Sequence, residues 1–349
     1  MMNPLIHISI IVPAYNSSRD LYECLCALKA SSYPGMEIIV VDDASIDDTS
    51  SVAARMGVHV LHLGKNSGPA AARNHGVHHA HGAIFFFVDA DVIVKPGTVG
   101  HIIEFFEEHP DVAAVFGSYD VFPRAKGIVS QYRNLLHHFV HQTGNPEAST
   151  FWAGCGAIRR SAFEAIGGFD EKRFPRASIE DIEMGYRLRQ AGHRIFLDKS
   201  LQGTHLKRWT LRSVIRTDIL CRAIPWTRLI MQSTHILNDL NLKWGQRLSG
   251  VLVLLACLFL PLAVVRFEFI AVSAAALLIV VILNRELYSF FLRQRGFLFT
   301  LVCIPLHLLY YFYSILSYLY VWIGFKLTLV QDKSLTAETQ RPHGSTSSP

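Results

Sequence analysis

The sequence predicts an α/β domain with a doubly wound, mostly parallel sheet, followed by helices that lie against a membrane and helices that cross it. Two observations predict this class. Before residue 90, short apolar runs alternate with segments of helical periodicity, which is the pattern of parallel strands joined by covering helices. Beyond residue 247, long stretches contain almost no charge, which is typical of membrane-spanning helices.

Apolar runs of strand length and helical segments make up the alternating part. The expected strands are residues 8–12, 37–41, 58–63 and 83–88, and the expected helices are residues 21–30, 49–56 and 69–79. Pro69 in the first turn of the third helix, after Ser67 and Gly68, marks where that helix begins. Strands that alternate with helices in this order run parallel, so their carboxyl ends meet at one edge of the sheet.

Polar side chains follow three of these runs. The segments are Pro13, Ala14 and Tyr15 after the first run, Asp42 and Asp43 after the second, and Asp89, Ala90 and Asp91 after the fourth. Because they share one edge, we expect them to form one site. Carboxylates one residue apart at the end of a buried strand suit a divalent cation with bound phosphates, although Asp89 and Asp91 can also simply start a turn. No glycine-rich loop follows the first run, which argues against a dinucleotide-binding or P-loop domain.

Three stretches of the C-terminal part are long and apolar enough to cross a bilayer core. They are residues 248–265, 267–283 and 297–325. Arg266 and Glu268 lie in the short connection between the first two, which predicts a tight hairpin. Arg285, Arg293 and Arg295 favour the cytoplasmic side for the loop before the third stretch, which contains a proline and can tilt, kink or re-enter. The sequence therefore predicts a multi-pass protein of the cell (inner) membrane with its soluble domain in the cytoplasm.

A basic segment joins the two parts. Between residues 207 and 228 the chain carries six basic residues and one acid, and Leu211, Ile215 and Ile219 recur at helical spacing. This pattern predicts helices at the membrane interface with basic groups at lipid phosphates, or else a solvated basic helix. The expected organisation is a soluble domain over 1–205, interfacial helices over 206–247, a membrane region over 248–325 and a polar, disordered tail over 326–349.

Composition argues against several other classes. The net charge of +5 is modest and nucleic-acid-binding motifs are absent, which favours lipid and phosphate groups as partners over nucleic acid. The six cysteines show no metal-ligand spacing, so we expect reduced thiols. Residues 1–7 lack the basic and apolar blocks of a secretory signal.

Six motifs occur in order along the soluble part. They are SIIVPAYN at 9–16, EIIVVDDASIDDT at 37–49, NSGPAAARNHG at 66–76, VDAD at 88–91, GGFDE at 167–171 and IEDIEMGYRLRQAGH at 179–193. Together they resemble glycosyltransferase family 2, whose members have the GT-A fold and use nucleotide-activated sugars. The resemblance covers residues 8–209 and leaves little weight for a mere turn at Asp89 and Asp91.

The resemblance implies a nucleotide-sugar site at the edge of the sheet. The residues expected to bind the nucleotide sugar are Pro13, Ala14, Tyr15, Asp42, Asp43, Arg73, Asp89, Ala90 and Arg208. Asp42 or Asp43 would accept a hydrogen bond from the base, and Arg73 would lie near the diphosphate or support the metal loop. Asp91 would bind Mg²⁺ or Mn²⁺ directly, with Asp89 at the ribose or at a metal-bound water. The cation would neutralise the charge of the leaving nucleoside diphosphate.

Asp181 matches the general base of the family. A carboxylate beside the acceptor hydroxyl removes its proton as the oxygen attacks the anomeric carbon from the face opposite the leaving group, which inverts the configuration. The alternative is that Glu180 and Asp181 only interact favourably with the positive end of a helix dipole. Glu180 and Glu183 are expected to support this loop or to bind acceptor hydroxyls.

A segment with sequence TFWAGCGAIRR at 150–160 corresponds to the acceptor region of the family. Trp152 would stack on a sugar face, and Gly154 would allow the acceptor to approach closely. Packing of Trp152 in the core is the alternative.

The segment HLKRW at 205–209 departs from the family's processive synthases, which carry glutamine where this chain has His205. Arg208 would still reach the diphosphate and Trp209 the acceptor. His205 would add a metal ligand or orient a loop. The departure counts against processive synthesis.

The sequence therefore predicts a membrane-bound inverting glycosyltransferase that moves a sugar from a nucleotide sugar to a hydroxyl of a lipid-linked or membrane-associated glycan. A polyprenyl-phosphate sugar transferase is the nearest competing function, but an acceptor phosphate is already ionised and has less need of a base such as Asp181. Two more functions compatible with the sequence are a processive polysaccharide synthase and a catalytically inactive membrane scaffold. The intact carboxylates argue against the scaffold.

Overall fold

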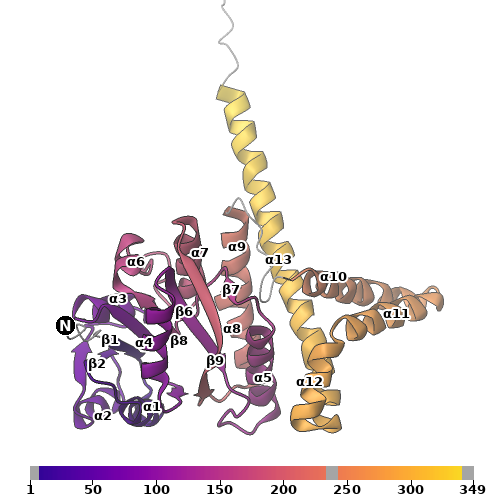
Figure 1. Ribbon diagram of the computed structural model, residues 1–349. Helices are drawn as coiled ribbons and strands as arrows, with labels where there is room; N and C mark the ends of the chain where they lie inside the picture. Colours follow the sequence, from indigo (N-terminus) through magenta and orange to yellow (C-terminus); the bar gives the residue numbers. More distant parts are fainter. Residues whose placement is uncertain (1–7, 233–242, 340–349) are drawn as a thin grey trace, which may run out of the picture.

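The computed structural model describes residues 8–232 and 243–339. One sheet with helices on both faces makes up the N-terminal part, and long helices lie beside it (Figure 1). The predicted α/β class followed by apolar helices is confirmed.

The N-terminal half of the sheet is parallel, as predicted. Its strands are β1 (Ile8–Ala14), β2 (Met36–Asp42), β3 (His59–His62) and β4 (Ile84–Val88). β1 lies between β2 and β4, and β3 pairs with β2. The connecting helices are α1 (Ser18–Ala30), α2 (Thr49–Arg55) and α3 (Pro69–His78). The parallel arrangement places the ends of β1, β2 and β4 at one edge.

The other half of the sheet is mixed. β8 (Cys155–Arg159) is antiparallel to both β4 and β6 (Val112–Tyr119), and β6 is parallel to β9 (Arg194–His205). The short strands β5 (Val92–Val94) and β7 (Glu147–Ala148) pair antiparallel with β9. The prediction of a mostly parallel sheet therefore holds for the first half only. The sequence does not show the direction of the later strands, because a run that is apolar on both faces looks the same in a parallel and an antiparallel position.

The sheet separates two apolar cores. The remaining helices on its faces are α4 (Thr98–Glu108), α5 (Ile128–Gln142), α6 (Arg160–Ala165) and α7 (Glu180–Gln190). Phe85 and Phe87 pack on the face covered by α3, α5, α6 and α7, whereas Phe86 packs on the face covered by α1 and α4. Side chains alternate along a strand, so β4 must be apolar at every position. The first core continues to Leu287 and Phe291 in the C-terminal helices.

Two loops at the carboxyl edge hold residues other than glycine in the left-handed region. Asn16 after β1 has φ 47°, and Ala44 after β2 has φ 59°. The loops are joined, since the Asn16 amide donates to Ser45 Oγ at 2.9 Å and the Ile46 amide donates to Asn16 Oδ1 at 2.8 Å. Alanine is strained in this conformation because its Cβ crowds the backbone.

We expect Ala44→Gly to raise the free energy of unfolding by about 0.5–1 kcal/mol, because the relief of strain exceeds the added freedom of the unfolded chain. Thermal unfolding of the purified protein, followed by circular dichroism, measures the change. The control is Ala54→Gly in the exposed part of α2, which is expected to lower the stability by about 1 kcal/mol. A lower melting temperature for Ala44→Gly than for the parent protein would contradict the strain at this position.

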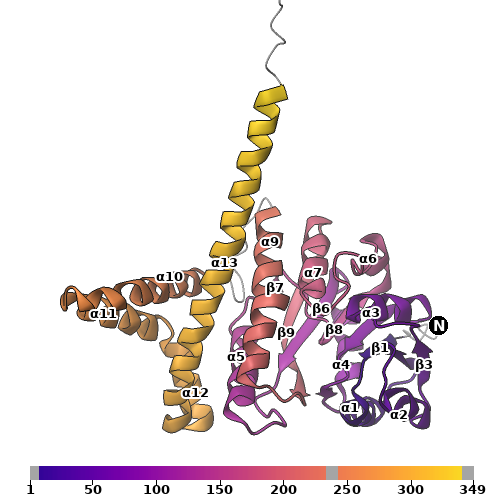
Figure 2. The ribbon, with the colours of Figure 1, turned by 180° about the vertical axis from the view of Figure 1, so that it is seen from behind.

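A continuous helical segment connects the sheet to the C-terminal helices. It comprises α8 (Leu211–Thr217), the π-helical η1 (Asp218–Ala223) and α9 (Ile224–Gln232). Figures 1 and 2 show α8 and α9 between the sheet and the long C-terminal helix. The helical form of this basic segment agrees with the prediction, and its contact with a membrane stays a prediction. Residues 233–242 of the predicted interfacial segment lie outside the described residues.

The apolar C-terminal part begins with a hairpin. Its elements are α10 (Trp244–Phe259), the 3-10 turn η3 (Leu260–Val264), α11 (Glu268–Leu283), α12 (Arg285–Arg295) and α13 (Phe297–Thr339). The rings of Phe259 and Phe269 stack with their centroids 5.4 Å apart, and Ser273 Oγ donates to the carbonyl oxygen of Ala256 at 3.1 Å. These contacts pair α10 with α11, as expected from the short connection.

Two helical segments, residues 244–264 and 297–327, are long and apolar enough to cross a membrane, and α11 with α12 would make a third if this pair, bent by 66°, forms one span. The predicted loop before the third stretch is instead the helix α12. Pro305 lies inside α13 without ending it. α13 continues to Thr339, and residues 340–349 of the polar tail lie outside the described residues.

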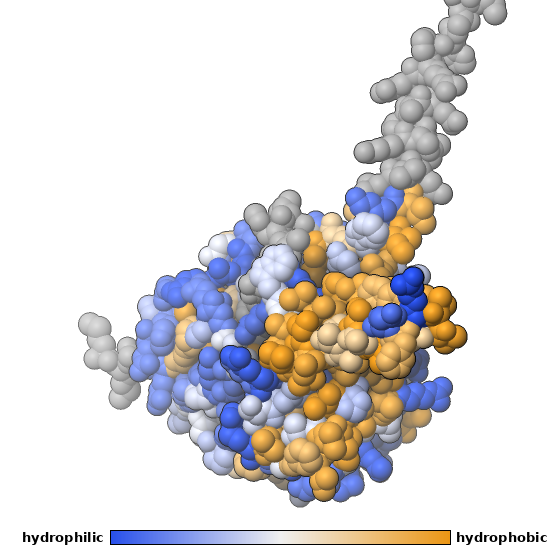
Figure 3. All heavy atoms as spheres, turned by 90° about the vertical axis from the view of Figure 1, so that its right-hand side faces the viewer, coloured by the Kyte–Doolittle hydropathy of each residue, from blue (hydrophilic) through white to orange (hydrophobic). Residues whose placement is uncertain are grey.

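The C-terminal helices present apolar side chains to the outside. Figure 3 shows this apolar surface on the side of the molecule where α10, α11 and α12 lie. Val264 and Phe267, at the turn of the hairpin, are 93% and 78% exposed. Extended apolar surfaces of this kind mark sites that interact with a membrane or with another protein.

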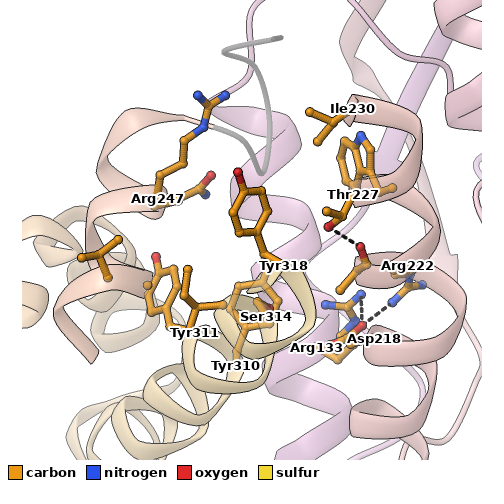
Figure 4. A pocket seen from close by; sticks show the side chains of 16 residues that line it. Arg133, Asp218, Arg222, Thr227, Ile230, Arg247, Tyr310, Tyr311, Ser314 and Tyr318 are labelled. Carbon is orange, nitrogen blue, oxygen red and sulfur yellow. Dashed lines mark hydrogen bonds and ion pairs between the residues drawn. The ribbon is translucent and has the colours of Figure 1, made fainter. Parts of the chain in front are cut away.

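A buried polar cluster fastens α13 to the sheet domain (Figure 4). Asp218 of η1 is 3% exposed, and its carboxylate accepts from Arg133 of α5 at 3.0 Å, from Arg222 at 2.9 Å and from the Tyr313 hydroxyl of α13 at 2.7 Å. A cavity of about 380 Å³ lies beside this cluster, with Tyr318 on its α13 side. Because the buried charge is fully paired, it fixes the positions of three elements.

Candidate active site

The structure gathers the predicted acids at the edge formed by the ends of β1, β2 and β4. The Asp43 amide donates to the carbonyl oxygen of Ala14 at 2.9 Å, which joins the first two loops. Tyr15 is 49% exposed beside them, whereas Ala14 is buried. Ala90 is also buried, between the two carboxylates of the third loop.

Asp42 and Asp43 differ in what they contact. Both oxygens of Asp43 accept from backbone amides, those of Ser67 at 2.7 Å and Gly68 at 2.8 Å, so Asp43 holds the start of α3. Burial raises the pKa of Asp43, against these hydrogen bonds, which lower it. Asp42 accepts from the Ser45 amide at 3.0 Å, and its other oxygen lies 3.4 Å from His62 Nδ1. Asp42 therefore has one oxygen, Oδ2, that accepts no hydrogen bond from a described backbone amide, whereas both oxygens of Asp43 do.

Arg73 links two loops of the site. It is 4% exposed on α3, and its guanidinium donates to Asp89 Oδ1 at 2.7 Å and to Glu180 Oε1 at 3.0 Å. Burial opposes the charge of Arg73, but Asp89, Glu180 and Asp181 outweigh burial and raise its pKa. Gly76 allows α3 to lie this close to β1, since a Cβ at Gly76 would stand 2.6 Å from a methyl group of Ile11.

Asp89 and Asp91 have different partners. Burial raises the pKa of Asp89, although Arg73 acts in the opposite direction. For Asp91, burial also raises the pKa, but the contact with His205 and the charge of Lys207 outweigh it, and the pKa lies below its ordinary value. Asp91 therefore stays ionised beside the ion pair of Asp89 with Arg73.

His205 reaches Asp91 because of the pairing of β9 with β5. In this register His205 lies opposite Val92, and the Leu206 amide donates to the carbonyl oxygen of Asp91 at 2.9 Å. His205 Nε2 is 3.6 Å from Asp91 Oδ2, and its ring stacks on Tyr119 with centroids 4.1 Å apart. The sequence indicated His205 from a motif position only, and the structure supplies the contact.

The donor set at Asp91 and His205 fits a divalent cation. A carboxylate oxygen and an imidazole nitrogen are ligands that Mn²⁺ accepts, and Mg²⁺ is commonly held by a carboxylate with phosphate oxygens and water. Within residues 8–232 and 243–339, no three His, Cys, Asp or Glu side chains are arranged to hold a metal ion by themselves. Asp89 is engaged by Arg73, so two protein ligands would remain, with a diphosphate to complete the coordination.

Asp181 is the second residue of α7 and lies beside the 150–156 segment. Its Oδ2 accepts from the Ala153 amide at 3.1 Å and its Oδ1 from the Ile182 amide at 2.8 Å. Gly185 permits this approach, since a Cβ there would stand 2.4 Å from the backbone nitrogen of Phe151. Burial raises the pKa of Asp181 to about 7, and the charge of Glu180 acts in the same direction. A carboxylate with this pKa can take a proton near neutral pH.

The residues predicted to contact the acceptor are largely enclosed, which fits the alternatives of core packing for Trp152 and loop support for Glu180. Glu180 is buried, and its oxygens accept from Arg73 and from the Ser178 amide, the latter at 2.8 Å. Trp152 is partly buried, with its indole against Gly154, where a Cβ would stand 2.6 Å from the ring. Glycine at position 154 therefore leaves room for the indole of Trp152, rather than for an acceptor.

The last two residues of the 205–209 motif differ in burial, since Arg208 is at the surface and Trp209 is in the interior. Trp209 is 8% exposed, its amide donates to Ser130 Oγ at 2.8 Å, and its indole has no hydrogen-bond partner in the described part of the chain. Arg208 is exposed. Stacking of Trp209 on an acceptor stays a prediction.

Two residues near the cation position escaped the sequence analysis. Tyr119, at the end of β6, forms the ring stack with His205, and no spacing in the sequence brings the two together. Asp20, in the first turn of α1, has its pKa raised by burial and by the charge of Asp91. Its acidic side chain follows the first strand by only six residues, which is the signal that could have found it.

The fold and the acidic edge define a GT-A type domain. The structure is similar to that of the mannosyltransferase PcManGT from Pyrobaculum calidifontis in complex with GDP-Man and Mn²⁺, with a TM-score of 0.58, 19% identity, and coverage of 90% of this chain and 87% of that one. At this identity the likeness concerns the fold alone.

The Glycosyl transferase family 2 model matches residues 9–167. The pre-mycofactocin glycosyltransferase of Mycobacterium tuberculosis is 29% identical over 219 residues, which are 60% of this chain and 44% of the relative. Glycosyltransferase GlyG of Streptococcus pneumoniae is 30% identical over 161 residues, which are 45% of this chain and 53% of the relative. Residues 9–167 therefore form a glycosyltransferase family 2 domain, and the chain spans about half the length of these curated relatives.

Proposed function

We propose that this protein is an inverting, metal-assisted glycosyltransferase that moves a sugar from a nucleotide-sugar donor to a hydroxyl of a lipid-linked or membrane-associated glycan. The observation that carries the proposal is the contact of Arg73 with both Asp89 and Glu180. This contact joins the loop of the metal-side carboxylates to the start of the helix that bears Asp181. The proposed base, Asp181, and the proposed diphosphate site then lie on either side of the buried guanidinium of Arg73.

The donor would bind at the ends of β1 and β2. Pro13, Ala14 and Tyr15 would line the nucleotide cleft, and Asp42 would accept from the base, because Asp43 spends both oxygens on backbone amides. Arg208, exposed after β9, would reach the diphosphate.

A divalent cation bound at Asp91 and His205 would neutralise the charge that develops on the leaving nucleoside diphosphate. The complex of the structurally similar PcManGT with Mn²⁺ supports the use of a divalent cation. Asp89, held by Arg73, would face the ribose or a metal-bound water.

Asp181 would accept the proton of the acceptor hydroxyl. The acceptor oxygen then forms its bond to the anomeric carbon while the bond from that carbon to the diphosphate oxygen breaks. The displaced nucleoside diphosphate leaves with the electron pair, and the configuration at the anomeric carbon is inverted. The amides of Ala153 and Ile182 keep the Asp181 carboxylate oriented during this step.

The acceptor would be presented at a membrane, because two or three C-terminal helices are apolar enough to span one. The arginines before α13 would place the sheet domain on the cytoplasmic side of the inner membrane. A panel of nucleotide sugars, offered to the purified protein in lipid with and without Mn²⁺, tests the function through diphosphate release. Absence of both donor binding and release would favour an inactive scaffold.

The cation makes a test of its own. We expect EDTA to abolish transfer, Mn²⁺ or Mg²⁺ to restore it, and His205→Gln to raise the Mn²⁺ concentration for half-maximal rate by about tenfold or more. The chain contains a matched control in His101 of α4, whose Nε2 lies 2.6 Å from a different carboxylate, Asp198 Oδ2. His101→Gln should leave the metal dependence unchanged. Transfer that continues undiminished in EDTA would rule out the metal role of Asp91 and His205.

A further inference from the structure

A basic pocket lies between the loop that precedes α7 and the helical segment α8–η1–α9. Its volume is about 770 Å³, and its lining includes Arg173, Arg176, Arg212, Arg216 and Arg228 but no aspartate or glutamate. Two chain segments that are far apart in sequence supply these side chains. The pocket therefore collects positive charge by tertiary contact rather than by a local basic run.

Within the part of the chain that the structure describes, no carboxylate compensates the charge of this pocket. Across residues 8–232 and 243–339, none of the five arginines pairs with a carboxylate, and Arg173 donates to the amide oxygen of Gln232 at 2.6 Å. The opposite face of the same helix differs, because Arg222 and Arg133 both pair with Asp218. Guanidinium groups that surround one cavity repel each other, and an oxyanion with several acceptor oxygens removes that repulsion.

The pocket adjoins the candidate active site. Ser178 Oγ donates to the carbonyl oxygen of Cys221 in η1 at 3.0 Å, and the Ser178 amide donates to Glu180 Oε2 at 2.8 Å. On the other side, the loop touches the nucleotide region, since a Cβ at Gly68 would stand 2.8 Å from the carbonyl oxygen of Pro175. The wall of the pocket is thus three residues from Asp181 along the chain.

We propose that this pocket binds a phosphate or diphosphate group of the acceptor, which makes the acceptor an anionic, phosphate-bearing molecule. The inference rests on the proposed function, in which the donor diphosphate belongs at Asp91 and His205. Arg73 and Glu180 separate that position from the arginine pocket, which leaves the pocket for the second substrate.

Binding of inorganic pyrophosphate to the purified full chain in detergent and EDTA, measured by calorimetry, tests the pocket without turnover. We expect Arg212→Gln/Arg216→Gln to weaken binding by about tenfold or more. Arg176→Gln should weaken it less. The charge-matched control Arg55→Gln/Lys126→Gln, at exposed positions outside the pocket, should bind like the parent protein. Equal binding by the parent and the Arg212/Arg216 variant would overturn the proposal, as would loss of binding in Asp91→Asn instead.

Two further measurements distinguish a phosphate of the acceptor from the donor diphosphate and from bulk lipid head groups. In transfer assays, Arg212→Gln/Arg216→Gln should raise KM for the acceptor by about tenfold or more and leave KM for the donor unchanged. A rise in donor KM alone would overturn the proposal. When phosphatidylglycerol is added to the detergent micelles, the parent protein should bind pyrophosphate as tightly as it does without this lipid. Loss of pyrophosphate binding in the presence of phosphatidylglycerol would assign the arginines to bulk lipid. Failure of the parent protein to transfer any sugar would refute the function but leave the pyrophosphate result standing.

Discussion

Asp181→Asn is expected to lower kcat by about 10²–10⁴-fold, the range that general-base catalysis contributes, and to leave donor affinity unchanged. Asparagine keeps the size of the side chain and an oxygen for the amides of Ala153 or Ile182, but it cannot accept the acceptor proton. Single-turnover transfer and donor titration on the same samples measure the two quantities. Undiminished kcat would exclude Asp181 as the base.

The pH dependence follows from the raised pKa of about 7 at Asp181. Only the ionised carboxylate accepts a proton, so log kcat/KM should rise with pH below about 7 and level off above it. Asp181→Asn should lose this limb from its residual activity. A variant that retains the same acidic limb would assign the titration to another group.

The raised pKa of Asp181 also predicts how the stability of Asp181→Asn, relative to the parent protein, changes with pH. The unfolded chain releases the Asp181 proton near the ordinary value of 3.8, whereas the folded protein keeps it until about 7. In that window the folded state binds more protons, so the stability of the parent protein falls as pH rises. Asp181→Asn lacks this titration, and its melting temperature relative to the parent should therefore increase between pH 4 and pH 7. A constant difference would contradict the raised pKa.

Arg73→Gln is expected to lower the free energy of unfolding by about 3–5 kcal/mol, because it leaves the buried carboxylate of Glu180 and the partly buried one of Asp89 without their shared cation. Glu180, which is almost fully buried, loses an ion pair of 3.0 Å, and Asp89 loses one of 2.7 Å. Transfer activity should fall as well, since Asp89 and the start of α7 are no longer held together. Denaturant unfolding monitored by tryptophan fluorescence measures the stability.

The surface of the protein offers a matched control for Arg73. Arg194 also bridges two carboxylates, Asp111 and Glu147, but all three side chains are 41–58% exposed. Arg194→Gln should therefore cost less than about 1 kcal/mol. Adding Glu180→Gln to Arg73→Gln should recover part of the lost stability, because it removes one uncompensated charge. Equal losses for Arg73→Gln and Arg194→Gln would show that burial of the Arg73 cluster does not matter.

The sequence predicted the first half of the sheet well because its information is local. The strands β1, β2 and β4 lie in apolar runs, and a helix between them can carry its own start signal, such as Pro69 for α3. The gathering of Asp42, Asp43, Asp89 and Asp91 followed from the parallel order alone. These features need no knowledge of distant contacts.

The remaining features depend on contacts between distant segments. The antiparallel position of β8 and the pairing of His205 with Val92 follow from how whole elements pack, which no local pattern records. The difference between Asp42 and Asp43 likewise comes from the amides of Ser67 and Gly68, more than twenty residues away. Motif positions named the residues, and only tertiary structure assigned their partners.

The apolar core that continues from the sheet to Leu287 and Phe291 has a consequence for how this chain can be divided. The apolar C-terminal helices are part of the same folding unit as the sheet that carries the acidic edge, rather than a separable segment. A soluble fragment ending after α9 would expose the side of α5 that α12 covers and would leave Asp218 without Tyr313. Folding of the acidic edge and docking of the apolar C-terminal helices are therefore expected to occur in one cooperative event.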